Sequence, residues 1–569
     1  GGPYFELMAG VYTDNQPDFS YLLPYETKEF SQFWWPYSKL GPVQNADKDF
    51  AIRLEILPGN RLDIGVAASS DFENLQILIR IGDSIKIFEG INISPGKPWQ
   101  NNTMGIDSLM TDNIEMSVLD NNGNERLSYC IEDHSESRER GIAREPLEPQ
   151  KIKSTSEQVL IAEHLEQYRH PTRYPEPYLK EAIKLDEYNF SALNALGRLE
   201  LKRGNFSEAE EILIRSKNIV TRYHPNPASG EGLYYLGLTQ YYQGKISEAY
   251  ENFYKSAWNY EWRSAGYYQL ATIDCIRKDF NAALDHLESS LDTNRQNNKA
   301  YLLQSIILRK RGRGDEAKEL LEKLGSMDKL DHWAGFEMAI HNDDYKDFLA
   351  SSRNDAQTII DIAGDYAESG FFDEIITLIE LHHKNEISET ATPNPLNKTV
   401  MTDFILAWAY EKTGKQEKSL ELLKNAEKVK PDYFFPSRIF EQIILEWALD
   451  ECSRKLVPAY GLGNYFYDKK LHEKAIKVWL KGCNEDFEYA SLQRNLGIAN
   501  WNIRKDGDAA LKFYSRAIAI DPEDMRIRFE YDQLRKKLNH SPFDRLDDLE
   551  EIKEKILTRD DFSVEYVPC

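Results

Sequence analysis

The sequence predicts an α+β multidomain protein, in which β-strand segments are followed by a long α-solenoid. Three observations support this fold class. Residues 48–133 alternate apolar and polar side chains with a period of two, the period becomes helical from residue 156, and small residues then recur at a constant interval. The 569 residues are enough for about three to four domains.

The β part is predicted to contain a small antiparallel β-sandwich over residues 48–133. Short alternating runs such as Phe50–Ile56 and Leu75–Ile81 are typical of strands with one buried face. The pair Asn122-Gly123 lies between two apolar runs, which indicates a tight hairpin turn. Residues 134–155 are charged and contain two prolines, so we expect a linker there.

The helical part shows internal repetition. Anchor positions 237, 271 and 305 are 34 residues apart, and so are 463 and 497. This spacing resembles the tetratricopeptide repeat, in which two antiparallel helices pack closely where small residues meet. Unrelated helical hairpins would not keep this register. The anchors are Gly197, Gly237, Ala271, Ser305, Ala363, Ala407, Gly463 and Gly497.

The resemblance implies a solenoid of about eight to nine repeats over residues 156–540. The anchor intervals lengthen near 330–355, 385–400 and 433–455, where we expect extra helices or loops. Residues 541–569 resemble the start of a further helical pair, so we expect the natural chain to continue beyond them.

A second resemblance covers the first residues. Glu6 is followed nine residues later by Asn15-Gln16-Pro17, then by Phe19 and the turn Leu23-Pro24-Tyr25-Glu26. This order resembles the closing segment of aldose 1-epimerases (galactose mutarotases). The resemblance implies that residues 1–47 are the C-terminal strands of a β-supersandwich whose remainder lies upstream.

The same resemblance implies a sugar site. Glu6 would be the base that takes the proton of the anomeric hydroxyl, and Asp14, Asn15 and Gln16 would contact the sugar. The family places its catalytic histidines upstream of the glutamate, whereas this chain has none before His134. We therefore expect this chain alone to be inactive. The alternative for Glu6 is a buried strand glutamate paired with an arginine or lysine.

Trp34 and Trp35 come directly after the last strand expected in this segment, and the pair has two interpretations. Indole rings stack on the C–H faces of sugars, so both are candidate sugar-binding residues. The alternative is a hydrophobic plug at a domain junction, because neighbouring side chains on a strand point to opposite faces.

Tyrosines on the first helices of the repeats are candidates for binding a protein partner. They are Tyr234, Tyr241, Tyr242 and Tyr268, and the alternative is packing between helices. Asn194 and Arg198 approach the carboxylate-clamp pattern of chaperone cofactors. Position 231 is Glu rather than Lys, which disfavours that class of partner.

Composition excludes several other functions. Lys and Arg total 70 against 94 Asp and Glu, giving a formal net charge of −24, which disfavours nucleic acid and anionic lipid as partners. No apolar run is long enough for a membrane span. The five cysteines show no CxxC spacing, and His382–His383 has no ligand at metal spacing. Nucleotide-binding motifs are absent too, so we expect no metal and no cofactor.

Together, the two resemblances suggest a bacterial family with this domain order. The leading hypothesis is a carbohydrate-related protein, in which a mutarotase-like part recognises or processes a sugar and the repeats act as scaffold or self-association platform. The alternative is a non-enzymatic scaffold that binds a peptide or partner protein in the repeat groove. The sequence leaves open whether the complete protein is a sugar epimerase or glycoside-processing enzyme. The first residues do not have the pattern of a signal peptide, and we expect the natural chain to begin upstream of them, so the location is unknown and a cytoplasmic one is only slightly favoured.

Overall fold

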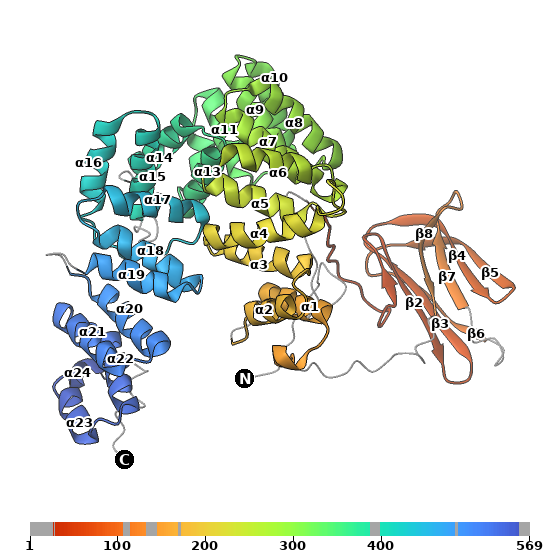
Figure 1. Cartoon of the computed structure of the whole chain (residues 1–569). Coiled ribbons are helices and arrows are strands. Elements are labelled where there is room, and N and C mark those ends of the chain that lie inside the picture. The colour runs from red at the N-terminus through yellow and green to blue at the C-terminus, as the bar shows by residue number, and fades with distance from the viewer. Residues whose placement is uncertain are drawn as a thin grey trace. The chain divides into compact units, whose positions relative to one another are not determined.

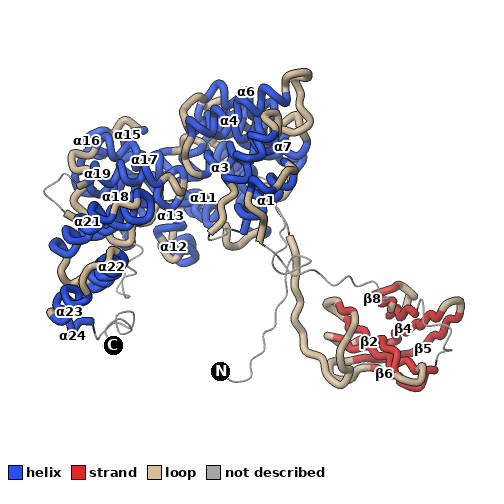
Figure 2. Tube along the Cα trace, turned by 60° about the horizontal axis from the view of Figure 1, so that its bottom comes forward, coloured by secondary structure: helices blue, strands red, loops and turns tan. Residues whose placement is uncertain are grey.

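The structure is a computed structural model that describes residues 27, 29–105, 114–131, 145–168, 172–386, 399–483 and 488–556. Strands and helices are segregated along the chain (Figures 1 and 2). The described residues up to Pro146, apart from Thr27, belong to one compact unit, and Thr27 and the residues from Leu147 onwards belong to a second. This order of a strand unit followed by a helical unit confirms the predicted fold class.

The first unit contains two antiparallel four-stranded sheets with the strand orders β1-β2-β3-β6 and β5-β4-β7-β8. Their inner faces form one core because every second residue is apolar and buried, as with Phe50, Ile52 and Leu54 on β2. The strands are β1 (Asn45–Ala46), β2 (Phe50–Leu57), β3 (Arg61–Ala68), β4 (Phe72–Ile81), β5 (Ser84–Ile93), β6 (Trp99–Gly105), β7 (Ile114–Leu119) and β8 (Glu125–Cys130).

The predicted hairpin turn joins β7 to β8. The Asp120 carboxylate accepts hydrogen bonds from the backbone N–H groups of Asn122 and Asn124, both at 2.9 Å. Gly123 has a φ of +80°, which a residue without a Cβ adopts at little cost. The prediction from Asn122-Gly123 is therefore confirmed.

Residues 29–44 lie outside the strands. Pro36 and Pro42 have no N–H to donate to a ladder, and Gly41 has a φ of +76°. Such residues interrupt strand pairing. The strands expected over residues 1–47 are therefore not found in this stretch, and residues 1–26 lie outside the described residues.

This irregular stretch covers the outer face of the β2–β3 pair. Trp35 and Leu40 pack against Ala51 and Ala67, whose small side chains leave room for them. The Trp35 Nε1–H also donates a 3.0 Å hydrogen bond to the Asp47 carbonyl. The stretch thus keeps apolar outer-face residues from water.

The second unit is a run of helices that pack on their sequence neighbours (Figure 1). The helices are η2 (Pro149–Lys151), α1 (Thr155–Tyr168), α2 (Glu176–Leu185), α3 (Phe190–Lys202), α4 (Phe206–Val220), α5 (Glu231–Tyr242), α6 (Ile246–Ser256), α7 (Tyr260–Ile276), α8 (Phe280–Thr293), α9 (Asn298–Lys310), α10 (Gly314–Met327), α11 (His332–Asn342), α12 (Lys346–Ser352), α13 (Ala356–Glu368), α14 (Phe372–Glu386), α15 (Val400–Lys412), α16 (Gln416–Ala426), α17 (Ile439–Glu451), α18 (Leu456–Asp468), α19 (His472–Gly482), α20 (Ala490–Ala499), η4 (Asn500–Arg504), α21 (Gly507–Ile520), α22 (Met525–Lys537), α23 (Pro542–Glu550) and α24 (Lys553–Ile556).

Small residues lie where the paired helices cross, as the repeat pattern predicted. A Cβ added to Gly197 would lie 2.5 Å from Leu213 of α4, and one added to Gly237 would lie 2.7 Å from a ring carbon of Phe253. Both distances are too short for real atoms, so only glycine permits the observed packing. Gly463 and Gly497 meet Trp479 and Tyr514 in the same way.

The array departs from strict pairing at two described places. The pair α11–α12 occupies the long interval between the anchors Ser305 and Ala363. Helix α17 is a single helix between the α15–α16 and α18–α19 pairs, and it packs on both α15 and α18. These additional helices account for the lengthened intervals in those parts of the sequence.

The array also curves until early and late helices touch. The Gln442 Nε2–H of α17 donates a 3.1 Å hydrogen bond to the carbonyl of Gly204, which follows α3. The Lys474 ammonium of α19 donates to the Asn205 side chain at 2.7 Å. These contacts join the turn between α3 and α4 to α17 and α19.

Among the described residues, no helix is both long and apolar enough to pass through a membrane. The same residues contain no group of three or more His, Cys, Asp or Glu side chains placed to hold a metal ion.

Candidate functional site

A groove lies between the C-terminal end of α5 and helices α13, α14, α15 and α17, and its volume is about 620 Å³. Its lining is mainly aromatic and aliphatic, although several charged side chains also reach it. The aromatic and aliphatic side chains that shape its walls include Tyr241, Tyr242, Phe372, Trp408, Phe440 and Ile443.

One wall is an aromatic cluster from three helices. The Trp408 ring lies edge-to-face with Phe372 at 5.3 Å and with Phe440 at 5.8 Å between ring centroids. Phe440 also packs beside α13, where a Cβ added to Gly364 would be in ordinary contact with the Phe440 ring at 3.4 Å. Partly buried rings held in this way form a preorganised apolar surface.

Two tyrosines from α5 form the facing wall. The Tyr241 hydroxyl donates a 2.7 Å hydrogen bond to the backbone carbonyl of Glu368, at the C-terminal end of α13. The Tyr242 ring stacks on Phe206 at 5.7 Å. Burial raises the pKa of both tyrosines, so both hydroxyls stay neutral at physiological pH.

Three carboxyl groups line the α13 side of the groove. Asp361, Asp365 and Glu368 lie on one face of the helix because they follow each other at intervals of four and three residues. Arg438 forms an ion pair with Asp361. The Lys299 ammonium lies 2.6 Å from Asp365.

Glu368 differs from its two neighbours. Its carboxyl group forms no hydrogen bond or ion pair with any described residue, and its Oε2 is buried. Burial raises the pKa of Glu368 to about 7, with Asp365 adding to the rise and Lys299 opposing it. The groove therefore contains one uncompensated acidic group near neutral pH.

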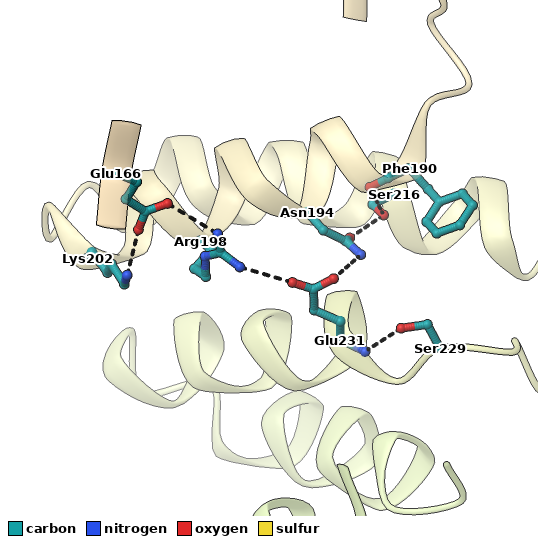
Figure 3. Close-up of polar contacts among 8 residues, drawn as sticks. All are labelled: Glu166, Phe190, Asn194, Arg198, Lys202, Ser216, Ser229 and Glu231. Atoms are coloured by element: carbon teal, nitrogen blue, oxygen red, sulfur yellow. Dashed lines mark hydrogen bonds and ion pairs between the residues drawn. The ribbon is translucent and has the colours of Figure 1, made fainter. Parts of the chain in front are cut away.

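A second polar cluster lies at the first helices of the early repeats, where Asn194 and Arg198 stood out in the sequence (Figure 3). The Glu231 carboxylate accepts hydrogen bonds from Asn194 Nδ2 at 3.3 Å and from Arg198 Nη1 at 3.2 Å. Arg198 Nη2 also donates to Glu166 at 3.1 Å, and the Lys202 ammonium donates to Glu166 at 2.5 Å. The donors that could hold a partner's carboxylate thus already hold this chain's own.

The pKa shifts agree with that interpretation. Burial acts to raise the pKa of Glu166, but the charges of Arg198 and Lys202 outweigh it, and the pKa is lowered. For Glu231, burial is the larger influence and Arg198 only partly offsets it, so the pKa is raised. This cluster is a structural ion-pair network across α1, α3 and α5.

The structure separates the four predicted partner-binding tyrosines into two groups. Tyr241 and Tyr242 line the groove. Tyr234 and Tyr268 are only 3% and 1% exposed, and Tyr234 lies against Trp262 with 5.0 Å between ring centroids. A partner cannot reach these two side chains in this structure, so for them the packing interpretation applies.

The two predicted tryptophans also differ. Trp35 packs on the sheet as described above, whereas Trp34 is 59% exposed. A sugar-binding role for Trp34 and Trp35 stays a prediction. Glu6, Asp14, Asn15 and Gln16 lie outside the described residues, and nothing within the described part of the chain supports sugar processing.

The adjacent histidines have separate surroundings. His382 Nδ1 lies 3.0 Å from the Asn354 side chain, and His383 Nε2 lies 3.1 Å from the Thr402 hydroxyl and 3.7 Å from Asp403. Burial lowers the pKa of His383. We interpret both histidines as packed polar residues between α13, α14 and α15.

Residues 45–129 match the family model described as YphG-like protein, second domain. The match covers the β-sandwich unit, which its strand pattern alone did not assign to a family.

Comparison with solved structures returns chains of low similarity. One is from the Naa15/Naa10 complex bound to HypK, with 12% identity over 68% of this chain and a TM-score of 0.25; the match spans 66% of that chain, just under two thirds. Another is YrrB, described as a TPR protein with an unusual peptide-binding site, with 13% identity over 42% of this chain and 95% of that one, and a TM-score of 0.16.

A third is a tetratricopeptide repeat protein from Parabacteroides merdae, with 14% identity over 61% of this chain and 98% of that one, and a TM-score of 0.18. At these TM-scores the matches carry no argument about partners. The repeat architecture rests on the helix pairs themselves.

Most of the groove was missed at the level of sequence. Tyr241 and Tyr242 were selected, but Trp408, Phe440 and Glu368 were not. Their shared location depends on curvature that joins α5 to α13 across 127 residues. The only hint in the sequence is the long interval between the anchors Ala407 and Gly463. It indicates an inserted helix, which is α17, but not which residues that helix contacts.

Proposed function

We propose that the helical unit is a protein-interaction scaffold that binds a peptide segment of a partner in the groove between α5 and α13–α17. The carrying observation is the partly buried aromatic wall of Trp408, Phe372 and Phe440 facing Tyr241 and Tyr242. Large apolar side chains of a partner would bury there, and such aromatic anchors carry much of the energy of peptide binding. The predicted roles of Tyr241 and Tyr242 belong to this proposal.

Selection from a peptide library tests this function without requiring the partner to be identified first. A random library of displayed 12-residue peptides is selected on the full chain, and the best peptides are synthesised with a fluorescent label. Affinities are then measured by fluorescence anisotropy for the unaltered chain, for Trp408→Ala, and for the control Trp258→Ala. Trp258 is a 52% exposed tryptophan at the α6–α7 turn, and it does not line the groove.

We expect Trp408→Ala to weaken binding by about tenfold or more, as truncation of a central aromatic anchor does. Trp258→Ala should change the affinity by less than about twofold. Failure to enrich any peptide, or enrichment of peptides that bind Trp408→Ala as tightly as the unaltered chain, contradicts the proposal.

A further inference from the structure

Not every charged group around the groove forms an ion pair within the described chain. Of the three carboxyl groups on the groove face of α13, Asp361 is paired with Arg438 and Asp365 with Lys299. Glu368 has no such partner among the described residues. Lys412, the other cation of the lining, lies over the Trp408 ring at 5.5 Å and forms no ion pair with a described residue.

A buried carboxyl oxygen without a hydrogen-bond donor is costly, and such groups are uncommon in folded proteins. Lys299 is already in contact with Asp365, so it compensates Glu368 only from a distance. The Glu368 carboxyl group can therefore accept a further cation or hydrogen-bond donor from outside the described chain.

The surroundings of Glu368 suit a cationic side chain with an aliphatic stem. Tyr241 contacts the Glu368 backbone directly, and the ring face of a tyrosine attracts an ammonium or guanidinium group. The aromatic wall next to it would receive the apolar neighbours of that residue. The formal net charge of −24 favours the approach of basic rather than acidic segments.

We propose that the groove takes a partner segment carrying a lysine or arginine flanked by large apolar side chains, with the basic group paired to Glu368. This rests on the proposed function and adds the chemistry of the partner. The apolar side chains lie on the Trp408–Phe440 wall, and the basic side chain crosses the groove to the C-terminal end of α13.

The test compares the peptides selected on two proteins. Parallel selections from the same 12-residue library are carried out on the unaltered chain and on Glu368→Gln. The control is Glu417→Gln, an exposed carboxylate on α16 that does not line the groove. Peptides from the unaltered chain and from the control should share a Lys or Arg next to apolar positions. Those from Glu368→Gln should keep the apolar positions and lose the basic one.

A double-mutant cycle makes the comparison quantitative. Replacing the basic residue of the best peptide by norleucine should weaken binding to the unaltered chain about tenfold, a typical effect of a desolvated ion pair. The same replacement should change binding to Glu368→Gln by less than about twofold. The peptide-side replacement on the unaltered chain requires no protein variant, so it is informative even where a variant folds poorly.

The outcomes separate the two proposals. Purely apolar peptides that depend on Trp408 but not on Glu368 would overturn the partner chemistry and leave the scaffold function standing. A basic residue that shows no coupling to Glu368 would overturn it as well. Loss of all Trp408-dependent binding would overturn the scaffold function itself.

Discussion

Two stretches of the same helical array differ in whether their carboxyl groups have ion-pair partners. On α1, α3 and α5, Glu166 and Glu231 are both held by Arg198, whose two terminal nitrogens donate to this chain's own carboxylates. On α13, two carboxyl groups are paired and Glu368 is not. The comparison teaches that one repeat architecture provides both a stretch whose carboxyl groups are held internally and a groove with an unpaired carboxyl group, and that local pairing of charges distinguishes them.

The pKa shifts express the same difference. At Glu166 the neighbouring cations outweigh burial and the pKa is lowered, whereas at Glu368 burial outweighs a distant Lys299 and the pKa is raised to about 7. The contrast holds for Glu166, whose charged form is favoured by its neighbours, whereas the pKa of Glu231 is raised by burial as that of Glu368 is.

The largest expected effect is loss of the cation shared by Glu166 and Glu231. Arg198→Ala would leave the carboxyl groups of Glu166 and Glu231 half-buried without their shared partner, and should destabilise the fold by about 2–4 kcal/mol. Chemical denaturation followed by circular dichroism measures this. Lys202→Ala is the control: its side chain is 61% exposed, and it should cost at most about 1 kcal/mol. Equal losses of unfolding free energy in the two variants would show that the Arg198 ion pairs do not stabilise this stretch.

The next effect concerns the contact between Gly204 and α17. Gly204 and Gly244 both follow a first helix with positive φ, at 73° and 76°. An added Cβ at Gly204 would collide with the buried Gln442 side chain, whereas one at Gly244 meets nothing within 4 Å. Gly244→Ala should therefore cost about 1 kcal/mol from backbone strain alone, and Gly204→Ala about 2 kcal/mol or more.

The same pair of variants separates stability from binding. Gly204→Ala should also weaken the selected peptides, because Gln442 fixes α17 and α17 carries Phe440. Gly244→Ala should bind them normally. Normal binding by Gly204→Ala would show that the groove does not depend on contact between α17 and the early repeats.

A smaller effect with the opposite sign is expected at Glu368. Its pKa is raised in the folded chain, so the folded state holds this proton over a pH range in which the unfolded state has released it. The stability contribution of Glu368 therefore falls as the pH rises from about 4.5 to about 7. Glu368→Gln should stabilise the chain by about 1–2 kcal/mol at pH 8 and by almost nothing at pH 4.5.

Thermal unfolding of both proteins across this pH range tests the sign. Asp365 and Lys299 are present in both proteins, and Lys299 stays charged over this range because its pKa is raised, so the difference between the two profiles reports the loss of the Glu368 carboxyl group. A variant that is less stable than the unaltered chain at pH 8 would indicate that Glu368 is compensated after all.

The smallest expected effect on stability concerns the hydrogen bond at the start of α5. The Ser229 hydroxyl accepts a hydrogen bond of 3.3 Å from the Glu231 backbone N–H at the start of α5 (Figure 3). Ser229→Ala should cost about 0.5 kcal/mol, because this turn already has other polar contacts. If Ser229→Ala lowered the free energy of unfolding as much as Arg198→Ala, the start of α5 would depend on its helix cap rather than on the ion pairs of Glu231.

The sequence was informative wherever a feature depends on near neighbours. Gly197 and Gly237 predicted the helix crossings because each contacts its partner helix within one repeat. Asn122-Gly123 predicted its turn for the same reason. The aromatic wall could not be predicted, because Trp408 and Phe440 face α5 only through the curvature of the whole array.

Residues 29–44 show a second limit of sequence interpretation. The resemblance to the closing segment of aldose 1-epimerases implies strands there, yet Pro36 and Pro42 lack the N–H group that a strand ladder uses, and the segment instead covers an outer sheet face. Tyr234 and Tyr268 show a third. A tyrosine on a first helix has the same local pattern whether it faces the groove or the next helix, so only the structure separates them from Tyr241.

The hydrogen bond between Gly204 and Gln442 has a consequence for the order of folding. Most helix contacts join neighbouring elements, so repeats can form locally and quickly along the chain. The Gly204–Gln442 contact instead joins residues 238 positions apart, and such loop closure is slow and comes after the segments on both sides exist. The contact between α17 and the early repeats is thus expected to form late in folding. A fragment that stops before α17 should keep its helices and the Tyr241–Glu368 contact, but lose the part of the groove wall that Phe440 supplies.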